Sequence, residues 1–137
     1  MGMRRYKVLV VEDNPNDVAL LRLALTEAHV DCDLTVIDDG GDALSFVRQV
    51  AGDAVPDLAV LDLNLPKRDG LEVLQGMRSN PALLDVPVAI LSSSSAPRDR
   101  SRLQTFGVRR YLVKPPDFDE FLKLGQELKD LLPEDSG

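Results

Sequence analysis

Three carboxylate side chains stand directly after two apolar segments of the chain. Val11 is followed by Glu12 and Asp13, and Leu61 is followed by Asp62. If these segments end at one place, mutual repulsion of the carboxylates is costly unless a cation lies among them. Mg²⁺ would relieve that repulsion, because it binds oxygen ligands and needs few carboxylates while it keeps several waters. The pattern therefore predicts a Mg²⁺ site.

A hydroxyl and an ammonium group occupy similar positions later in the chain. Ser92 ends one apolar segment, and Lys114 follows another. Singly, such residues most often cap a helix, sit in a turn or carry a solvated charge. Four segments that all end in these groups favour one shared site instead. If Asp62 attacks a phosphoryl group, Mg²⁺ and Lys114 can stabilise the added negative charge, and Ser92 can donate to a phosphoryl oxygen.

Five short β-branched segments alternate with stretches of helical spacing, which predicts strands joined by helices. The predicted strands are residues 7–11, 33–37, 58–61, 88–91 and 111–113, and the predicted helices begin at Asn14 or Asn16, after 39–41 and at about Gly70, and cover 97–106 and 117–132. In the last helix, Phe118, Phe121, Leu122, Leu128 and Leu132 are expected to face the core. Such alternation predicts a parallel sheet covered by helices on both faces, with ligands beyond the carboxyl ends of its strands.

The composition describes one ordinary globular domain of 137 residues with 44% apolar residues. The single cysteine, Cys32, excludes a disulfide framework and a cysteine-rich metal site, and a cytoplasmic protein is expected. The net charge of −7 argues against nucleic-acid binding. No apolar run has the length that a membrane span needs. His29 and Cys32 are expected at the end of the first helix.

Four motifs in register resemble the receiver domains of two-component response regulators, and the resemblance covers residues 6–132. They are Val10-Val11-Glu12-Asp13, Asp62-Leu63-Asn64-Leu65-Pro66-Lys67-Arg68-Asp69-Gly70, Val86-Pro87-Val88-Ala89-Ile90-Leu91-Ser92 and Tyr111-Leu112-Val113-Lys114-Pro115. The resemblance implies an α/β, flavodoxin-like (βα)₅ domain, doubly wound, with a five-stranded parallel sheet of order 2-1-3-4-5. It leaves residues 133–137 as a short polar tail, with no output domain expected.

The resemblance also implies roles for the residues above. Asp62 would accept a phosphoryl group from a sensor histidine kinase. Mg²⁺ would be held by Asp13, Asp62 and the backbone carbonyl of Asn64, with Glu12 acting through water. Lys114 would pair with the phosphoryl group, Ser92 would move towards it, and Tyr111 would swing as Ser92 moves. The supporting residues are Pro66, Gly70 and Pro115.

Some residues depart from the family pattern, and others indicate a particular group within the family. Glu12 replaces the commoner Asp, Ser92 replaces the commoner Thr, and Pro116 leaves open whether the Lys114–Pro115 bond is cis. The sequence around the site is similar to single-domain regulators that serve bacterial phytochromes, so the kinase partner could be a bacteriophytochrome.

Two alternatives fit the residues less well. A Mg²⁺-dependent phosphatase with an aspartyl nucleophile would need a second Asp where Asn64 stands. An inactive pseudo-receiver would lack the acidic pair, Asp62 or Lys114, and all are present. The protein is therefore expected to be no enzyme beyond its own phosphorylation and slow dephosphorylation, and to signal through protein contact.

The predicted fourth helix, fifth strand and fifth helix carry both basic and acidic residues. This mixed face is either simply solvated or a two-fold homodimer interface, in which one copy's basic residues meet the other's acidic ones. The candidate residues are Arg98, Arg102, Arg109, Arg110, Asp117 and Glu120.

Overall fold

The structure is a computed structural model that describes residues 5–63, 70–93 and 100–133, with the side chains at positions 100 and 102 left aside. Its strands are β1 (Tyr6–Val11), β2 (Cys32–Ile37), β3 (Leu58–Leu61), β4 (Val88–Ser92) and β5 (Arg110–Val113). Its α-helices are α1 (Pro15–Glu27), α2 (Gly40–Gln49), α3 (Gly70–Arg78), α4 (Arg100–Thr105), α5 (Phe118–Leu122) and α6 (Leu124–Lys129). Two short 3₁₀ turns, Gly52–Ala54 and Pro81–Leu83, precede β3 and β4.

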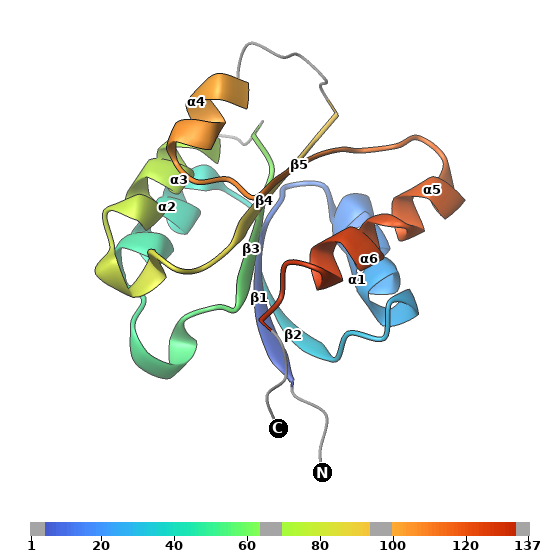
Figure 1. The fold of residues 1–137 in the computed structure, drawn as a ribbon, viewed down its shortest axis with the longest axis horizontal. Helices are drawn as coiled ribbons and strands as arrows, with labels where there is room; N and C mark the ends of the chain where they lie inside the picture. Colours follow the sequence, from blue (N-terminus) through green and yellow to red (C-terminus); the bar gives the residue numbers. More distant parts are fainter. Residues whose placement is uncertain (1–4, 64–69, 94–99, 134–137) are drawn as a thin grey trace.

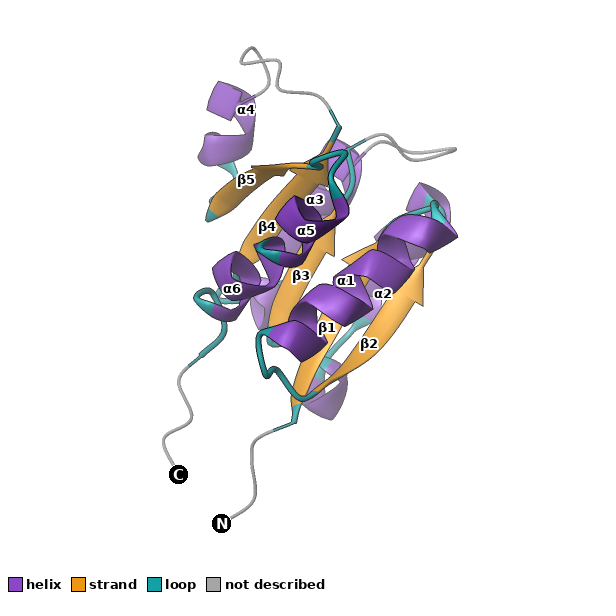
Figure 2. Ribbon diagram, turned by 90° about the vertical axis from the view of Figure 1, so that its right-hand side faces the viewer, coloured by secondary structure: helices purple, strands orange, loops and turns teal. Residues whose placement is uncertain are grey.

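The strands form one parallel sheet in the order β2-β1-β3-β4-β5 (Figure 2), which confirms the predicted fold class and strand order. Every residue of β3 and β4 is buried. These two strands therefore read as unbroken apolar runs, as expected for strands covered on both faces. The edge strand β2 has several exposed or half-exposed residues instead.

Helices cover both faces of the sheet (Figure 1). One apolar core includes Leu9, Leu61 and Ile90 and lies against α2, α3 and α4, whereas the other includes Val10, Val60 and Leu91 and lies against α1, α5 and α6. Successive residues of a strand point to opposite faces, so β1, β3 and β4 each contribute to both cores.

The first two helices begin where side chains can cap them. The side chain of Asn14 accepts hydrogen bonds from the backbone of Asn16 and Asp17, and Pro15 occupies the first turn. Asp39 caps α2 in the same way, accepting from the backbone of Asp42 at 2.8 Å. Both caps place these helices directly after the carboxyl ends of β1 and β2.

The prediction of one continuous helix over residues 117–132 was wrong. The chain turns at Lys123, which separates α5 from α6. Phe118, predicted to face the core, is 52% exposed, whereas Leu124 is buried. The turn brings Gly125 against α1 so closely that a Cβ at this position would lie 2.0 Å from the backbone oxygen of Ala24.

Other predicted boundaries differ by a few residues. Cys32 begins β2 and does not lie at the end of α1. The described part of the fourth helix starts at Arg100, and residues 97–99 of the prediction lie outside the described residues. Within the described parts of the chain, no helix is long and apolar enough to cross a membrane.

His29, two residues after the end of α1, has a left-handed backbone conformation, with φ of 60°. The next amide, that of Val30, donates to the carbonyl of Leu25 at 2.9 Å and completes the helix terminus. Glycine is the residue that this position favours, because a side chain strains the left-handed conformation.

We therefore expect His29→Gly to raise the free energy of unfolding by about 1 kcal/mol. Thermal unfolding would measure this as an increase in the melting temperature of about 3 °C. His29→Ala keeps a Cβ in the strained conformation and serves as the control that gains less. A glycine variant no more stable than the alanine variant would contradict the interpretation.

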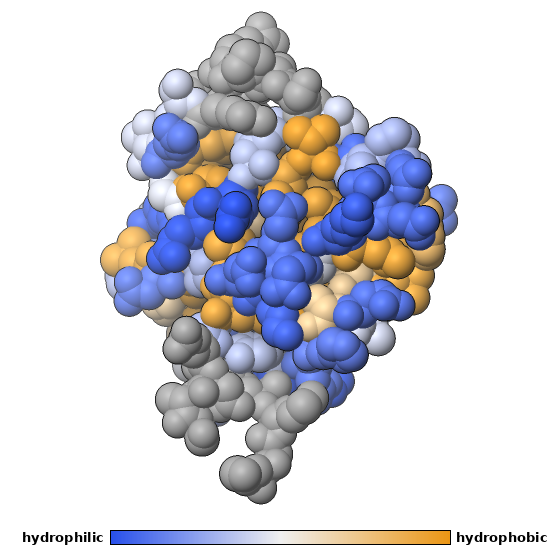
Figure 3. Space-filling model, turned by 45° about the vertical axis from the view of Figure 1, so that its right-hand side comes forward, coloured by the Kyte–Doolittle hydropathy of each residue, from blue (hydrophilic) through white to orange (hydrophobic). Residues whose placement is uncertain are grey.

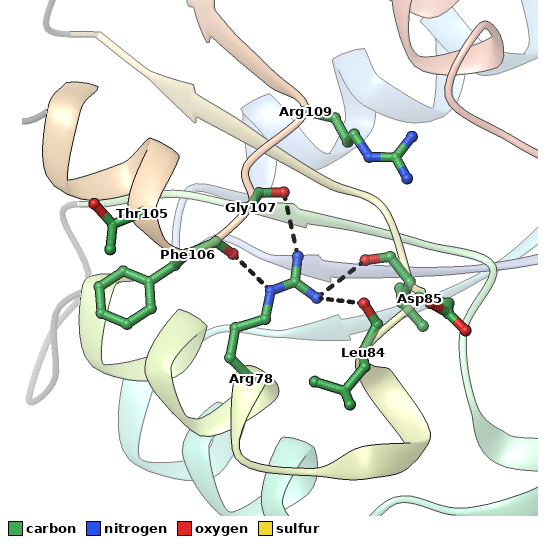
Figure 4. Close-up of a pocket in the computed structure, with 8 residues that line it drawn as sticks. Arg78, Leu84, Asp85, Thr105, Phe106, Gly107 and Arg109 are labelled. Atoms are coloured by element: carbon green, nitrogen blue, oxygen red, sulfur yellow. Dashed lines mark hydrogen bonds between the residues drawn. The ribbon is translucent and has the colours of Figure 1, made fainter.

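Arg78, at the end of α3, ties together two turns that precede β4 and β5 (Figure 4). Its guanidinium donates hydrogen bonds to the backbone carbonyls of Leu83, Leu84, Val86, Phe106 and Gly107. Figure 4 shows the bonds to Leu84, Phe106 and Gly107. The shortest, from Nε to the Phe106 oxygen, is 2.6 Å. Burial lowers the pKa of Arg78, and the nearby charge of Arg109 lowers it further. The side chain is thus an internal clamp.

We expect Arg78→Met to lower the free energy of unfolding by about 2–3 kcal/mol, because it leaves several partly buried carbonyls without their charged donor. Chemical denaturation would measure the loss. Arg109→Met is the matched control, since Arg109 lines the same pocket but its side chain makes no hydrogen bond or ion pair within the described part of the chain. Equal losses in the two variants would contradict the role of Arg78 as a clamp.

Candidate functional site

Backbone hydrogen bonds fix the predicted site residues at the carboxyl ends of the strands. The amide of Glu12 donates to the carbonyl of Ile37 at 3.0 Å, and the amide of Asp62 donates to the carbonyl of Val11 at 2.9 Å. Each bond continues a strand pairing one residue past the strand. The backbone of Glu12 and of Asp62 is therefore held by the same pairing that joins the strands.

The structure brings the three predicted acids together. Glu12, Asp13 and Asp62 each offer a carboxylate oxygen, and these oxygens all lie within 4.8 Å of one another. Glu12 and Asp62 are buried, and Asp13 is exposed. The cluster therefore combines two buried carboxylates with one that is exposed to solvent.

Lys114 joins this cluster from the end of β5. Its amide donates to the carbonyl of Ser92 at 2.7 Å, which fixes the start of the side chain. Its ammonium lies 2.6 Å from Glu12 Oε1, 2.8 Å from Asp17 Oδ2 and 3.3 Å from Asp62 Oδ2. Burial alone would lower the pKa of Lys114, but the hydrogen bonds to Asp17 and Glu12 and the charges around it raise the pKa overall. Lys114 thus stays a cation.

Glu12 is held in an environment that opposes its charge. Its side chain is 2% exposed, and burial raises its pKa to about 7, with the neighbouring Asp62 adding to the rise and the contact with Lys114 opposing it. Its Oε1 atom meets the Lys114 ammonium as an ion pair but has no hydrogen bond of normal geometry among the described residues. A buried carboxylate oxygen that can still accept a hydrogen bond fits a site for a cation or for the water bound to one.

Gly70 lies against the backbone of Asp62, the predicted acceptor. A Cβ at this position would lie 2.4 Å from the backbone oxygen of Asp62 and 2.9 Å from the Cα of Leu63. The amide of Gly70 also donates to the carbonyl of Leu63 at 3.1 Å. The start of α3 can therefore approach the acceptor only because residue 70 has no side chain.

The remaining predicted residues lie in different environments. Ser92 is buried at the end of β4, and Tyr111 is half-buried and packs against the core on the α4 side. The Lys114–Pro115 bond, which the sequence left open, is not cis. Asn64 and Pro66 lie outside the described residues, so their predicted roles have no structural account.

The predicted dimer face is only partly described. Arg109 and Arg110 are exposed, as are Asp117 and Glu120, while residue 98 and the side chain of residue 102 lie outside the description. Asp117 caps α5, and Glu120 pairs with Lys123 at 2.9 Å. Figure 3, which views the side where β5, α5 and α6 lie, shows hydrophilic and apolar groups mixed on one face.

One site residue, Asp17, was not predicted from the sequence. Its carboxylate reaches Lys114 from the first turn of α1 and is 18% exposed. The available signal was the Asn14 cap, which fixes where α1 begins and hence that Asp17 lies in its first turn. Because an acid in that turn is commonly explained by the helix dipole alone, the residue gave no sign of a partner on β5.

The sequence profile of the response regulator receiver domain matches residues 8–125. The chain belongs to this family. It is therefore a receiver domain of the two-component systems, a phospho-accepting signalling protein.

This receiver domain is similar to response regulators from other organisms. The response regulator Rcp1 of Synechocystis sp. is 34% identical over 125 residues, which are 89% of this chain and 85% of Rcp1. Two solved structures are 32% identical to this chain. The phosphorylated cyanobacterial phytochrome response regulator RcpA has a TM-score of 0.82 over 94% of both chains. The Mn²⁺-bound form of Rcp1 has a TM-score of 0.80 over 94% of this chain and 99% of that one.

Binding of Mg²⁺ at the acid cluster can be tested by thermal unfolding. We expect Mg²⁺ to raise the melting temperature, because a cation that binds the folded acids but not the unfolded chain stabilises the fold, by about 2.7 kcal/mol at a hundred times its dissociation constant. Asp13→Asn removes one ligand and should abolish most of the shift. Asp42→Asn removes an exposed acid from the first turn of α2 and should leave it intact. A shift that survives Asp13→Asn would argue against this cluster.

Proposed function

We propose that Asp62 accepts a phosphoryl group from a sensor histidine kinase and that Mg²⁺, held at the acid cluster, is required. The observation that carries this proposal is the meeting of three carboxylates and the Lys114 ammonium at the end of β3, in a chain of the receiver family. The Mn²⁺-bound form of Rcp1 supports a divalent cation in such a domain.

The proposed transfer forms one bond and breaks one. A carboxylate oxygen of Asp62 attacks the phosphorus atom, and the bond from phosphorus to the donor breaks, with its electron pair leaving on the donor. Asp62 exchanges one negative charge for about two on the acyl phosphate. Lys114, already within 3.3 Å of this carboxylate, lies where it can stabilise the added charge.

The cation fits the residues that surround Asp62. We assign Asp13, Asp62 and the backbone carbonyl of Asn64 as its protein ligands, with Glu12 acting through water. Bound there, Mg²⁺ would neutralise charge on the phosphoryl oxygens. Asp13, the exposed member of the cluster, leaves room for the waters that Mg²⁺ retains.

The proposed output is a change of protein contacts. Ser92 would donate to the phosphoryl group, and Tyr111, half-buried beside β4, would change position with it. We propose the face formed by α4, β5 and α5 as the responsive surface and as a homodimer interface. We propose no enzymatic activity beyond the gain and slow loss of its own phosphoryl group. The net charge of −7 argues against a nucleic-acid partner.

The likeness to RcpA, a phytochrome response regulator, supports a phytochrome-type histidine kinase as the donor. We propose a cytoplasmic location for the protein, which its single cysteine supports. The supporting residues Pro66, Gly70 and Pro115 would shape the loops around Asp62; of these, Gly70 has the close approach described above.

The proposed acceptor is tested by phosphorylation with a small donor. With Mg²⁺ and acetyl phosphate, we expect one phosphoryl group per chain, detected by intact mass and released by hydroxylamine because it is an acyl phosphate. Asp62→Asn should abolish the label, since an amide is a far weaker nucleophile than a carboxylate. Asp42→Asn, the matched acid outside the site, should retain it. A hydroxylamine-labile label that persists in Asp62→Asn would assign the acceptor elsewhere.

A further inference from the structure

Asp17 stands apart from the acids that form the cluster. It lies on α1, whereas Glu12, Asp13 and Asp62 follow strands, and it is not among the residues whose oxygens meet within 4.8 Å. Its carboxylate makes an ion pair with Lys114 alone among the described residues. Any influence of Asp17 on the site is therefore expected to act through Lys114.

The ammonium of Lys114 is closer to Asp17 than to the proposed acceptor. The distance from Nζ is 2.8 Å to Asp17 Oδ2 and 3.3 Å to Asp62 Oδ2. Those two oxygens cannot lie farther apart than the two distances added together. The Asp17 carboxylate is thus near enough to offset part of the positive charge that Lys114 presents to Asp62.

We propose that Asp17 competes with the phosphoryl group on Asp62 for the charge of Lys114 and thereby weakens binding of that group, an inference that rests on the proposed function. In this role Asp17 is a positioning residue, because it acts through Lys114 and does not touch the phosphoryl group. The burial around the pair strengthens the competition, since the side chains of Lys114 and Asp17 are 14% and 18% exposed and water screens them little.

A simpler account of Asp17 exists and makes a different prediction. Acids in the first turn of a helix interact favourably with the helix dipole, and Asp17 lies there. If that were its whole role, removing its charge would change stability but not the affinity for a phosphoryl group. Asp42 occupies the matching position, three residues after the capping side chain of α2, and it is exposed. It makes no ion pair in the described structure.

Beryllofluoride, a tetrahedral anion that mimics a phosphoryl group on a carboxylate, separates these accounts. Its dissociation constant is measured by calorimetry with the full chain at saturating Mg²⁺, so that any change in cation affinity does not enter. We expect Asp17→Asn to bind about five- to tenfold more tightly than the wild type, because it removes a nearby negative charge and keeps an oxygen for Lys114. Asp17→Ala should shift the affinity in the same direction.

Two controls complete the test. Asp17→Glu keeps the negative charge and should bind beryllofluoride within about twofold of the wild type. Asp42→Asn should do the same, because the charge that it removes is remote from the site. Unchanged or weaker binding in Asp17→Asn would overturn the inference, and so would an equal gain in Asp42→Asn. If the inference about Asp17 fails but the wild type binds beryllofluoride and Asp62→Asn does not, Asp62 is still supported as the phosphoryl acceptor. If the wild type does not bind beryllofluoride, the proposed function fails, and the inference fails with it.

Discussion

Repulsion among carboxylates at one edge of the sheet is the constraint on which the rest of the site depends. Parallel pairing makes β1 and β3 end together, so Glu12, Asp13 and Asp62 must share one small volume. Burial of Glu12 and Asp62 increases the cost, because little water reaches them. The fold meets this cost in part with the Lys114 ammonium, and the remaining negative charge is what the proposed cation would neutralise.

The sequence predicted the strands and their order well, because buried parallel strands leave short, unbroken apolar runs such as those of β3 and β4. It also predicted the acid cluster, since strand ends are fixed by the same pattern. The break at Lys123 was missed because it accompanies a close approach of Gly125 to the backbone of α1, which no local pattern records. Asp17 was missed for a related reason, since its partner lies on a distant strand.

The two ends of the sheet are built differently. At the amino-terminal ends of β4 and β5, Arg78 holds neighbouring turns through bonds to backbone carbonyls, which do not change charge. At the carboxyl ends, the contacts of Lys114 are with carboxylates, which can gain or lose partners when a ligand arrives. The proposed chemical change at the carboxyl ends of the strands would therefore leave the contacts of Arg78 unchanged.

The pairing of Lys114 with Asp17 also bears on how the chain folds. The two residues are 97 positions apart in the sequence. During synthesis, β1, α1 and β3 therefore emerge with their acids long before Lys114, whose charge offsets part of theirs. The acid edge is complete only when β5 has joined the sheet, which ties the first quarter of the chain to the last. Contacts between residues so far apart in the sequence slow folding. A chain cut before β5 would keep the repulsion among the acids but lack the Lys114 ammonium that offsets part of it.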